Sequence, residues 1–169
     1  MTETPEITAA ILADHEQLRL GFVALDEASG AEELSVCWED LATRLDAHAE
    51  AEERIFYPQL LQVGTRAKDE TDDAIGDHNK IRDAVRDADA AAVGSSAWWE
   101  AVGRARTENS THLAEEEREA LPDFRRHAPD QLRHELGQIW ARFYVEHPAG
   151  RGVTTRDKDP EDYIARHDS

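Results

Sequence analysis

One polar pattern, His-x-x-x-Glu-Glu-Arg-x-x-x-Pro, occurs twice in the sequence, beginning at His48 and again 64 positions later at His112. Residues four apart on a helix lie one above the other, so each histidine shares a helix face with a glutamate, Glu52 or Glu116. Imidazole and carboxylate groups on facing helices are the ligands from which helical bundles build metal sites. The pattern therefore predicts two helices that contribute to one metal centre.

A second repeat supplies two further histidines. Residues 14–19, Asp-His-Glu-Gln-Leu-Arg, align with residues 77–82, Asp-His-Asn-Lys-Ile-Arg, which places His15 and His78 63 positions apart. The two repeat distances nearly agree. The sequence therefore predicts two helical hairpins related by a pseudo-twofold axis, each giving one His and one His-x-x-x-Glu.

The elements that must position these residues are long amphipathic helices. Ala, Leu, Glu and Arg are abundant, and apolar residues recur at alternating intervals of three and four. We predict an all-α fold, an up-down-up-down four-helix bundle with an additional C-terminal helix and an irregular tail. The predicted helices span about residues 6–28, 31–62, 66–92, 96–121 and 130–146.

The pattern changes after Pro122, and this change sets the predicted domain division. Residues 1–126 are expected to form the bundle, and residues 127–169 to form a helix and a tail packed on it. Residues 149–169 are rich in Gly, Asp and Arg, so we expect them to be largely irregular, with Tyr163 and Ile164 as anchors.

Six ionisable side chains interrupt the apolar faces of the predicted helices. Burying so many polar groups costs free energy unless each finds a strong partner, and a metal centre would supply one for all of them. The alternative, core histidines satisfied within the protein beside solvated glutamates, does not explain the duplicated spacing. The predicted metal ligands are His15, His48, Glu52, His78, His112 and Glu116.

The mixture of four imidazoles and two carboxylates restricts the kind of metal. Tetrahedral zinc sites use three or four ligands, and calcium and magnesium prefer all-oxygen sites. Imidazole with carboxylate suits iron or manganese, and the repeat indicates two ions, bridged by Glu52 and Glu116 with the histidines as terminal ligands. The sequence does not assign a histidine to either ion. Solvent-derived oxo or hydroxo bridges, dioxygen or peroxide would fill the other positions.

The composition limits the partners of the chain. Acidic residues number 37 against 19 Lys and Arg, a net charge of −18, which argues against nucleic acid and anionic membrane surfaces. No stretch is apolar enough for an export signal or a membrane span, and the one cysteine, Cys37, excludes a disulfide framework. We expect a cytoplasmic monomer or small homo-oligomer.

Over about residues 6–123, the order His…His-x-x-x-Glu…His…His-x-x-x-Glu resembles the hemerythrin-like family, the HHE cation-binding domains. The resemblance implies an up-down four-helix bundle that holds a non-haem di-iron centre with two carboxylate bridges. It also implies the same six ligands as the repeats do.

The chain departs from the pattern of the family's oxygen carriers at two positions. Those proteins carry a fifth histidine one turn before the third-helix ligand, where this chain has Ala74. They also carry an Asp five residues after the last histidine, where this chain has Glu117, although the repeat favours Glu116 as the ligand. A missing imidazole opens a coordination position. Four-His members with this pattern resemble an actinobacterial group associated with peroxide disproportionation.

The favoured hypothesis is a di-iron oxidoreductase that binds peroxide or dioxygen and turns it over, specifically by catalase-like disproportionation of hydrogen peroxide. Tyr57 is the candidate catalytic residue, as an extra ligand or a redox-active neighbour, although packing alone would also explain it. Two alternatives stay open. One is a protein that binds or senses O2, NO or iron without turnover, and the other is a di-iron oxidase or oxygenase of a small substrate.

Other polar residues near the motifs are expected to support the ligands or to face solvent. Asp14 and Asp77 could orient imidazoles, but each lies about 100° round the helix from its own neighbouring histidine, which argues against this role. Acidic residues expected on solvated faces or around the ligands, rather than among them, are Glu50, Glu53, Glu115 and Glu117.

Overall fold

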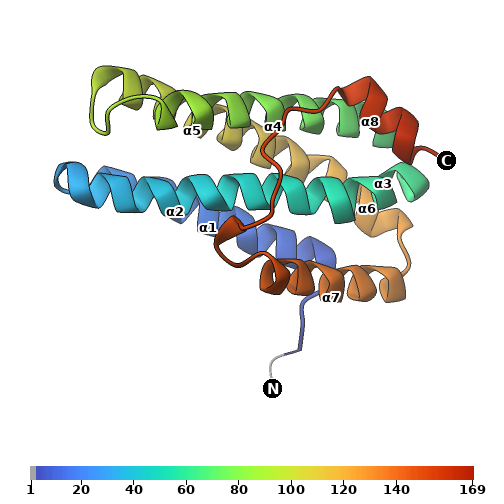
Figure 1. The fold of residues 1–169 in the computed structure, drawn as a ribbon. Coiled ribbons are helices and arrows are strands. Elements are labelled where there is room, and N and C mark those ends of the chain that lie inside the picture. Colours follow the sequence, from blue (N-terminus) through green and yellow to red (C-terminus); the bar gives the residue numbers. More distant parts are fainter. Residues whose placement is uncertain (1–2) are drawn as a thin grey trace.

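The structure, a computed structural model, describes residues 3–169 and contains helices and no β-strand within that range (Figure 1). The prediction of an all-α fold with a C-terminal helix is confirmed. The long helices that run up and down the molecule are α1 (Ile7–Glu27), α2 (Gly30–Ala51), α4 (Ala67–Asp89) and α5 (Ser96–Arg118).

Residues 31–62 are helical throughout, as predicted, but the helix is not α-helical over its whole length. A π-helical turn, η1 (Glu52–Phe56), follows α2, and α3 (Tyr57–Val63) follows the turn. The Tyr57 N–H accordingly donates to the carbonyl of Glu52, five residues back. Pro58 explains the change, because it lacks an N–H and its ring would clash with the carbonyl of Arg54 in an α-helix. The irregular turn therefore falls at the candidate ligand Glu52.

Pro122, in the second copy of the motif, interrupts the fourth helix in a similar way. The helix α5 ends at Arg118, three residues before the predicted end, and α6 (Ala120–His127) begins after Glu119. A proline at 122 would clash with the carbonyl of Arg118 in a continuous helix, whereas the first turn of α6 tolerates it.

The additional helix α7 (Asp130–Glu146) packs along α1 and buries Leu136, Trp140 and Phe143. Gly137 allows this close packing, because a Cβ at that position would lie 2.1 Å from the carbonyl oxygen of Pro5. The helix therefore covers the outer side of the first hairpin.

The chain beyond α7 is only partly irregular. A short 3₁₀ turn, η2 (Pro148–Gly150), leads into an extended segment that crosses α2, and α8 (Pro160–His167) then packs on α4 (Figure 1). The helix α8 lies where we expected a largely irregular tail, although its start carries two helix signals. Asp159 accepts a hydrogen bond from the backbone N–H of Asp162, and Pro160 follows Asp159. Tyr163 is buried, as expected for an anchor.

The apolar core consists of two clusters with a polar layer between them. One cluster surrounds Phe56 and Phe124, and the other surrounds Trp38 and Trp98. The helices α1, α2 and α4 contribute to both clusters, and each places a histidine where it passes from one to the other, for example His15 between Ile11 and Leu18. The helix α5 contributes to the second cluster, and α6 after it contributes to the first. The fold therefore holds its polar residues at one level of the bundle.

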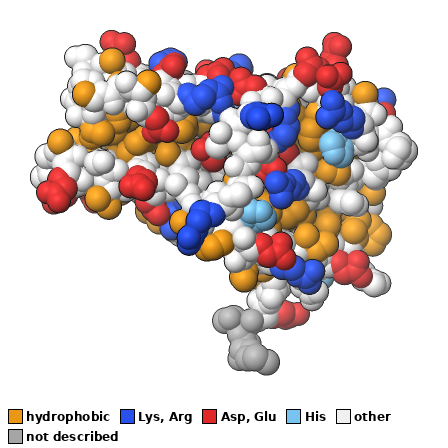
Figure 2. Space-filling model, in the orientation of Figure 1, with side chains coloured by type: hydrophobic (Ala, Val, Ile, Leu, Met, Phe, Trp, Pro, Cys, Tyr) orange, Lys and Arg blue, Asp and Glu red, His pale blue; other side chains and the backbone are white. Residues whose placement is uncertain are grey.

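The outer surface carries charges of both signs. Figure 2 shows acidic and basic side chains beside each other on the face that the C-terminal segment crosses. Within residues 3–169, no helix has the length and apolar character that crossing a bilayer requires.

Candidate metal centre

All six predicted ligand side chains lie in the polar layer, and none is more than 3% exposed. They come from five helical segments, so the layer ties the whole bundle together. The segments contribute His15 from α1, His48 from α2, Glu52 from η1, His78 from α4, and His112 with Glu116 from α5.

The carboxylate of Glu52 lies between two pairs of histidines. Its Oε1 is 2.8 Å from His48 Nε2 and 3.8 Å from His15 Nε2. Its Oε2 is 3.0 Å from His78 Nε2 and 3.4 Å from His112 Nε2. The donor atoms therefore form two groups that share Glu52, and each group is compact enough to hold a metal ion.

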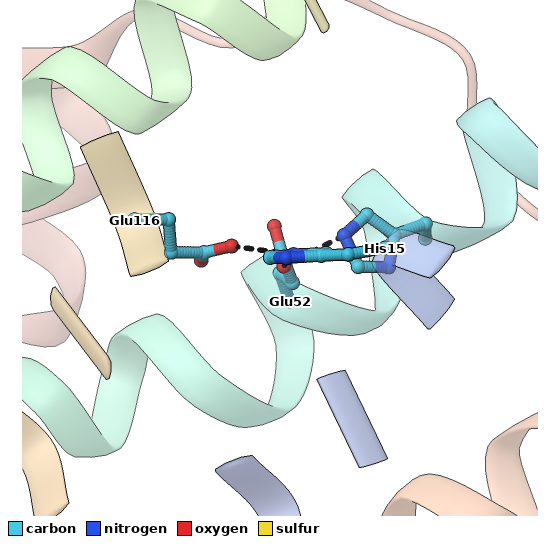
Figure 3. Close-up of side chains that lie close together, drawn as sticks. His15, Glu52 and Glu116 are labelled. Carbon is cyan, nitrogen blue, oxygen red and sulfur yellow. Dashed lines mark ion pairs between the residues drawn. The ribbon is translucent and has the colours of Figure 1, made fainter. Parts of the chain in front are cut away.

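Glu116 also spans both groups. Its Oε2 is 2.9 Å from His15 Nε2 and 3.9 Å from His112 Nε2. Figure 3 shows Glu116 and His15 with Glu52 between them, and dashed lines mark their ion pairs. One oxygen of Glu116 therefore joins the group of His15, His48 and Glu52 and lies near His112 of the other group.

Several donor atoms in this layer have no hydrogen bond within the described residues. They are almost inaccessible to solvent, and buried polar atoms are normally hydrogen-bonded. A cation coordinated at this point would satisfy all of them. The atoms are His15 Nε2, His48 Nε2, Glu52 Oε1 and Glu116 Oε2.

Each of the four candidate ligand histidines has a carboxylate beside its other ring nitrogen, Nδ1. A carboxylate that accepts the Nδ1 proton fixes the ring and leaves the Nε2 lone pair for a metal. The Nδ1–carboxylate distances are 2.9 Å for His15–Glu117, 2.8 Å for His78–Glu53, 3.4 Å for His48–Asp14 and 3.9 Å for His112–Asp77.

Each of these carboxylates lies on a different helix from its histidine, and the sequence argument about Asp14 considered only its chain neighbour. Asp14 approaches His48 on α2 rather than its chain neighbour His15, so the angle around its own helix did not decide its role. The hydroxyl of Tyr144 on α7 donates to the same Asp14 oxygen at 2.6 Å. Tyr144 was not identified from the sequence, because it lies outside both repeats.

Residues 6–142 match the family model described as the hemerythrin HHE cation binding domain. The chain belongs to this family. The matched region covers the bundle and most of α7, and no curated protein and no solved structure matches the chain. Together with the buried His and Glu groups, the family makes this a metal-binding protein, and it indicates iron as the metal.

The position of the fifth histidine in the family's oxygen carriers is occupied here by Ala74, which is 3% exposed. A cavity of about 20 Å³ lies beside it and is bordered by Tyr57, His112 and Glu116. This volume is enough for one water molecule. The family's extra imidazole is therefore replaced by a small space next to the candidate ligands.

Tyr57 lies in the polar layer and is 1% exposed. Its hydroxyl donates to Glu116 Oε1 at 2.6 Å. Burial, together with the negative charges of Glu116 and Glu52, holds the pKa of Tyr57 well above its usual value, so the phenol stays protonated. Its role as a ligand or a redox-active group stays a prediction.

The acidic neighbours favour the protonated form of the histidines, and a bound cation would replace these protons. Burial alone would lower the pKa of His15 and His78, but the buried glutamates beside them raise both to about 9. Burial would raise the pKa of Glu52, but the surrounding histidines hold it well below its usual value. Metal binding at this site must therefore release protons.

The carboxylate next to His78 is surrounded by positive charge. Glu53 is buried and accepts two hydrogen bonds from Arg82 at 3.0 Å, one to each oxygen. Lys158, from the segment before α8, also bonds to Glu53 and to the buried Glu50. Burial opposes ionisation of Glu53, but His78 and Arg82 lower its pKa to about 2.

The corresponding carboxylate of the other hairpin has a simpler environment. Glu117 is half-buried and pairs with Arg19, whose side chain is 45% exposed. The set His15, Glu117 and Arg19 therefore repeats the set His78, Glu53 and Arg82, but only Glu53 is also bonded by a lysine of the C-terminal segment. The contact of Lys158 with Glu53 could not be found from the sequence, because Lys158 lies outside both repeats.

Proposed function

We propose that the protein holds two iron ions in the polar layer, one beside His15 and His48 and the other beside His78 and His112. The observation that carries this proposal is the position of Glu52, which directs each of its oxygens to a different histidine pair. Four imidazole nitrogens with two carboxylates are a donor set that suits iron in helical bundles.

We further propose that the centre disproportionates hydrogen peroxide in a catalase-like reaction, with hydrogen peroxide or dioxygen as its small-molecule partner. Bound iron would supply the redox chemistry: one peroxide takes two electrons and two protons to give two waters, and a second gives them up to form dioxygen. No external reductant is needed, because the two half-reactions balance. The space beside Ala74, where the oxygen carriers have an imidazole, supports turnover over simple carriage.

The residues around this space are suited to handling the protons. The two half-reactions exchange two protons, so a group that holds a proton near the reacting molecule would assist both. Tyr57 borders the cavity and keeps its proton on Oη, hydrogen-bonded to Glu116. Buried side chains around the layer keep bulk water out of the site.

The test is oxygen evolution from hydrogen peroxide by the iron-loaded protein, measured with an oxygen electrode. We expect evolution well above that of the same amount of free iron, and a decrease in Tyr57→Phe at unchanged iron content. Evolution no greater than that of free iron would refute the catalase-like reaction. A stable, reversible spectral change on exposure to dioxygen would then favour a binding or sensing function.

A further inference from the structure

The cavity beside Ala74 has an acidic lining. It lies between α4 and α5, and six of its ten lining residues are Asp or Glu, so it differs from an ordinary gap in an apolar core. The acidic residues are Glu70, Asp73, Asp77, Glu115, Glu116 and Glu119.

These carboxylates lead from solvent to the candidate ligands. Asp73 is exposed and Glu115 is half-buried, whereas Glu70 is only 7% exposed. Glu116 and His112, at 3% exposure, form the inner end of the cavity and belong to the metal centre. A cation that followed this lining would meet a carboxylate at each depth.

Glu70 is the most unusual of these residues. Its Oε2 is buried and makes no hydrogen bond within the described residues. Burial and the nearby Asp123 carboxylate raise the pKa of Glu70 to about 7, because together they outweigh the opposing charge of Arg66. A buried carboxyl oxygen without a hydrogen bond costs free energy, and a cation bound beside Glu70 Oε2 would remove this cost.

The internal repeat allows residues of the cavity lining to be compared with their counterparts in the first hairpin. α1 corresponds to α4 with an offset of 63, and α2 with η1 corresponds to α5 with an offset of 64. At four of the six acidic positions the first hairpin is apolar and belongs to the buried core, whereas Asp77 and Glu116 correspond to the acidic Asp14 and Glu52. Ile7, Ala10, Ile11, Ala51 and Ile55 there correspond to Glu70, Asp73, Ala74, Glu115 and Glu119 here.

Neighbouring cations neutralise some of the lining but leave three carboxylates unpaired. Glu119 lies 3.7 Å from Arg66 and 3.6 Å from Arg118. Among the described residues, no ion pair involves Glu70, Asp73 or Glu115, and we call these three residues the acidic portal. The portal is therefore a one-sided feature, with negative charge on one hairpin where the other is sealed by aliphatic side chains.

We propose that the acidic portal is a transit site for Fe²⁺, which passes along these carboxylates to reach the polar layer. Carboxylate oxygens attract and coordinate divalent cations, whereas a neutral peroxide molecule gains little from them. This inference rests on the proposed iron site and adds the route by which that site is loaded.

The test compares rates of metal uptake. The portal variant is Glu70→Gln/Asp73→Asn/Glu115→Gln, which keeps side-chain shape and removes three charges. The matched control is Glu27→Gln/Glu32→Gln/Glu39→Gln, three exposed glutamates of α1 and α2 that also make no ion pair within the described residues. Chelator-treated proteins are mixed with Co²⁺ or anaerobic Fe²⁺ in a stopped-flow instrument, and the final metal content is measured separately.

We expect the portal variant to take up Co²⁺ and Fe²⁺ at least about tenfold more slowly than wild type, with the same final metal content. The control should change the rate less than about twofold, since it removes the same charge away from the route. Uptake by wild type should also slow more steeply with added salt than uptake by the portal variant. Single Glu70→Gln should show a smaller effect in the same direction.

Equal uptake rates for the portal variant and the control would overturn the transit site and leave the proposed function intact. Wild-type protein that binds neither Co²⁺ nor Fe²⁺ would instead overturn the proposed function, and the portal with it. Because uptake is measured without peroxide, the result does not depend on whether the iron centre is catalytic.

Discussion

The substitution Glu70→Gln is expected to stabilise the protein at alkaline pH. Burial raises the pKa of Glu70 from its ordinary 4.5 to about 7, so the folded protein holds this proton more tightly than the unfolded chain does. The free energy of unfolding must then fall as the pH rises from about 4.5 to about 7, and the loss is complete above that range. Glutamine keeps the shape of the side chain and cannot ionise.

The magnitude follows from the size of the pKa change. Each pKa unit corresponds to about 1.4 kcal/mol, so at pH 8 the ionised Glu70 reduces the free energy of unfolding by up to about 3 kcal/mol. At pH 5 the reduction should be less than about 1 kcal/mol. For a chain of this size the difference at pH 8 corresponds to a rise in Tm of roughly 6–12 °C in the variant.

The assay is urea denaturation followed by circular dichroism at pH 5 and pH 8, with the metal content of both proteins held equal. Glu39→Gln, at an exposed position on α2, is the control and should show no pH-dependent difference from wild type. A Glu70→Gln variant that is less stable than wild type at pH 8 would refute the reasoning. So would a difference that is the same at both pH values.

Two further predictions concern the ligands and the C-terminal segment. Replacing His48 or His112 with Ala should greatly reduce iron content and leave most helical circular dichroism intact, since the two apolar clusters persist; a full iron complement in either variant would show that the ligands are misassigned. Lys158→Met leaves two buried glutamates with one cationic partner fewer, and should lower the free energy of unfolding by about 1–3 kcal/mol. In urea denaturation the exposed pair of Lys68 serves as control, and equal losses for Lys158→Met and Lys68→Met would contradict the structural role of Lys158.

The helices and the level of the polar layer could be predicted from the sequence because both depend on local spacing. The four-residue interval from His48 to Glu52 fixes a shared helix face whatever the tertiary structure is. The duplication then indicates that the two motif copies meet. The division at residue 126 stays a prediction, and the family match extends past it to residue 142.

What could not be predicted depends on how one helix is placed against another. Whether Asp14 reaches His48 depends on the relative height of α1 and α2, which no periodicity in either helix determines. The same holds for Lys158, whose backbone is held on both sides by Asn79 and whose ammonium thereby reaches Glu53. By contrast, Pro58 was a visible signal of the π-helical turn η1, and the periodicity of apolar residues does not show this signal.

The π-helical turn has a consequence for how the two copies of the motif diverged. In an α-helix, a side chain five positions after Glu52 would point away from it, whereas in a π-helical turn residues five apart stack on the same side. The turn therefore rotates Tyr57 towards Glu116, while its counterpart in the second copy, Leu121, packs in the apolar core. A change of phase in a single helical turn thus places the phenol of Tyr57 in the polar layer, at a position where the second copy carries a leucine.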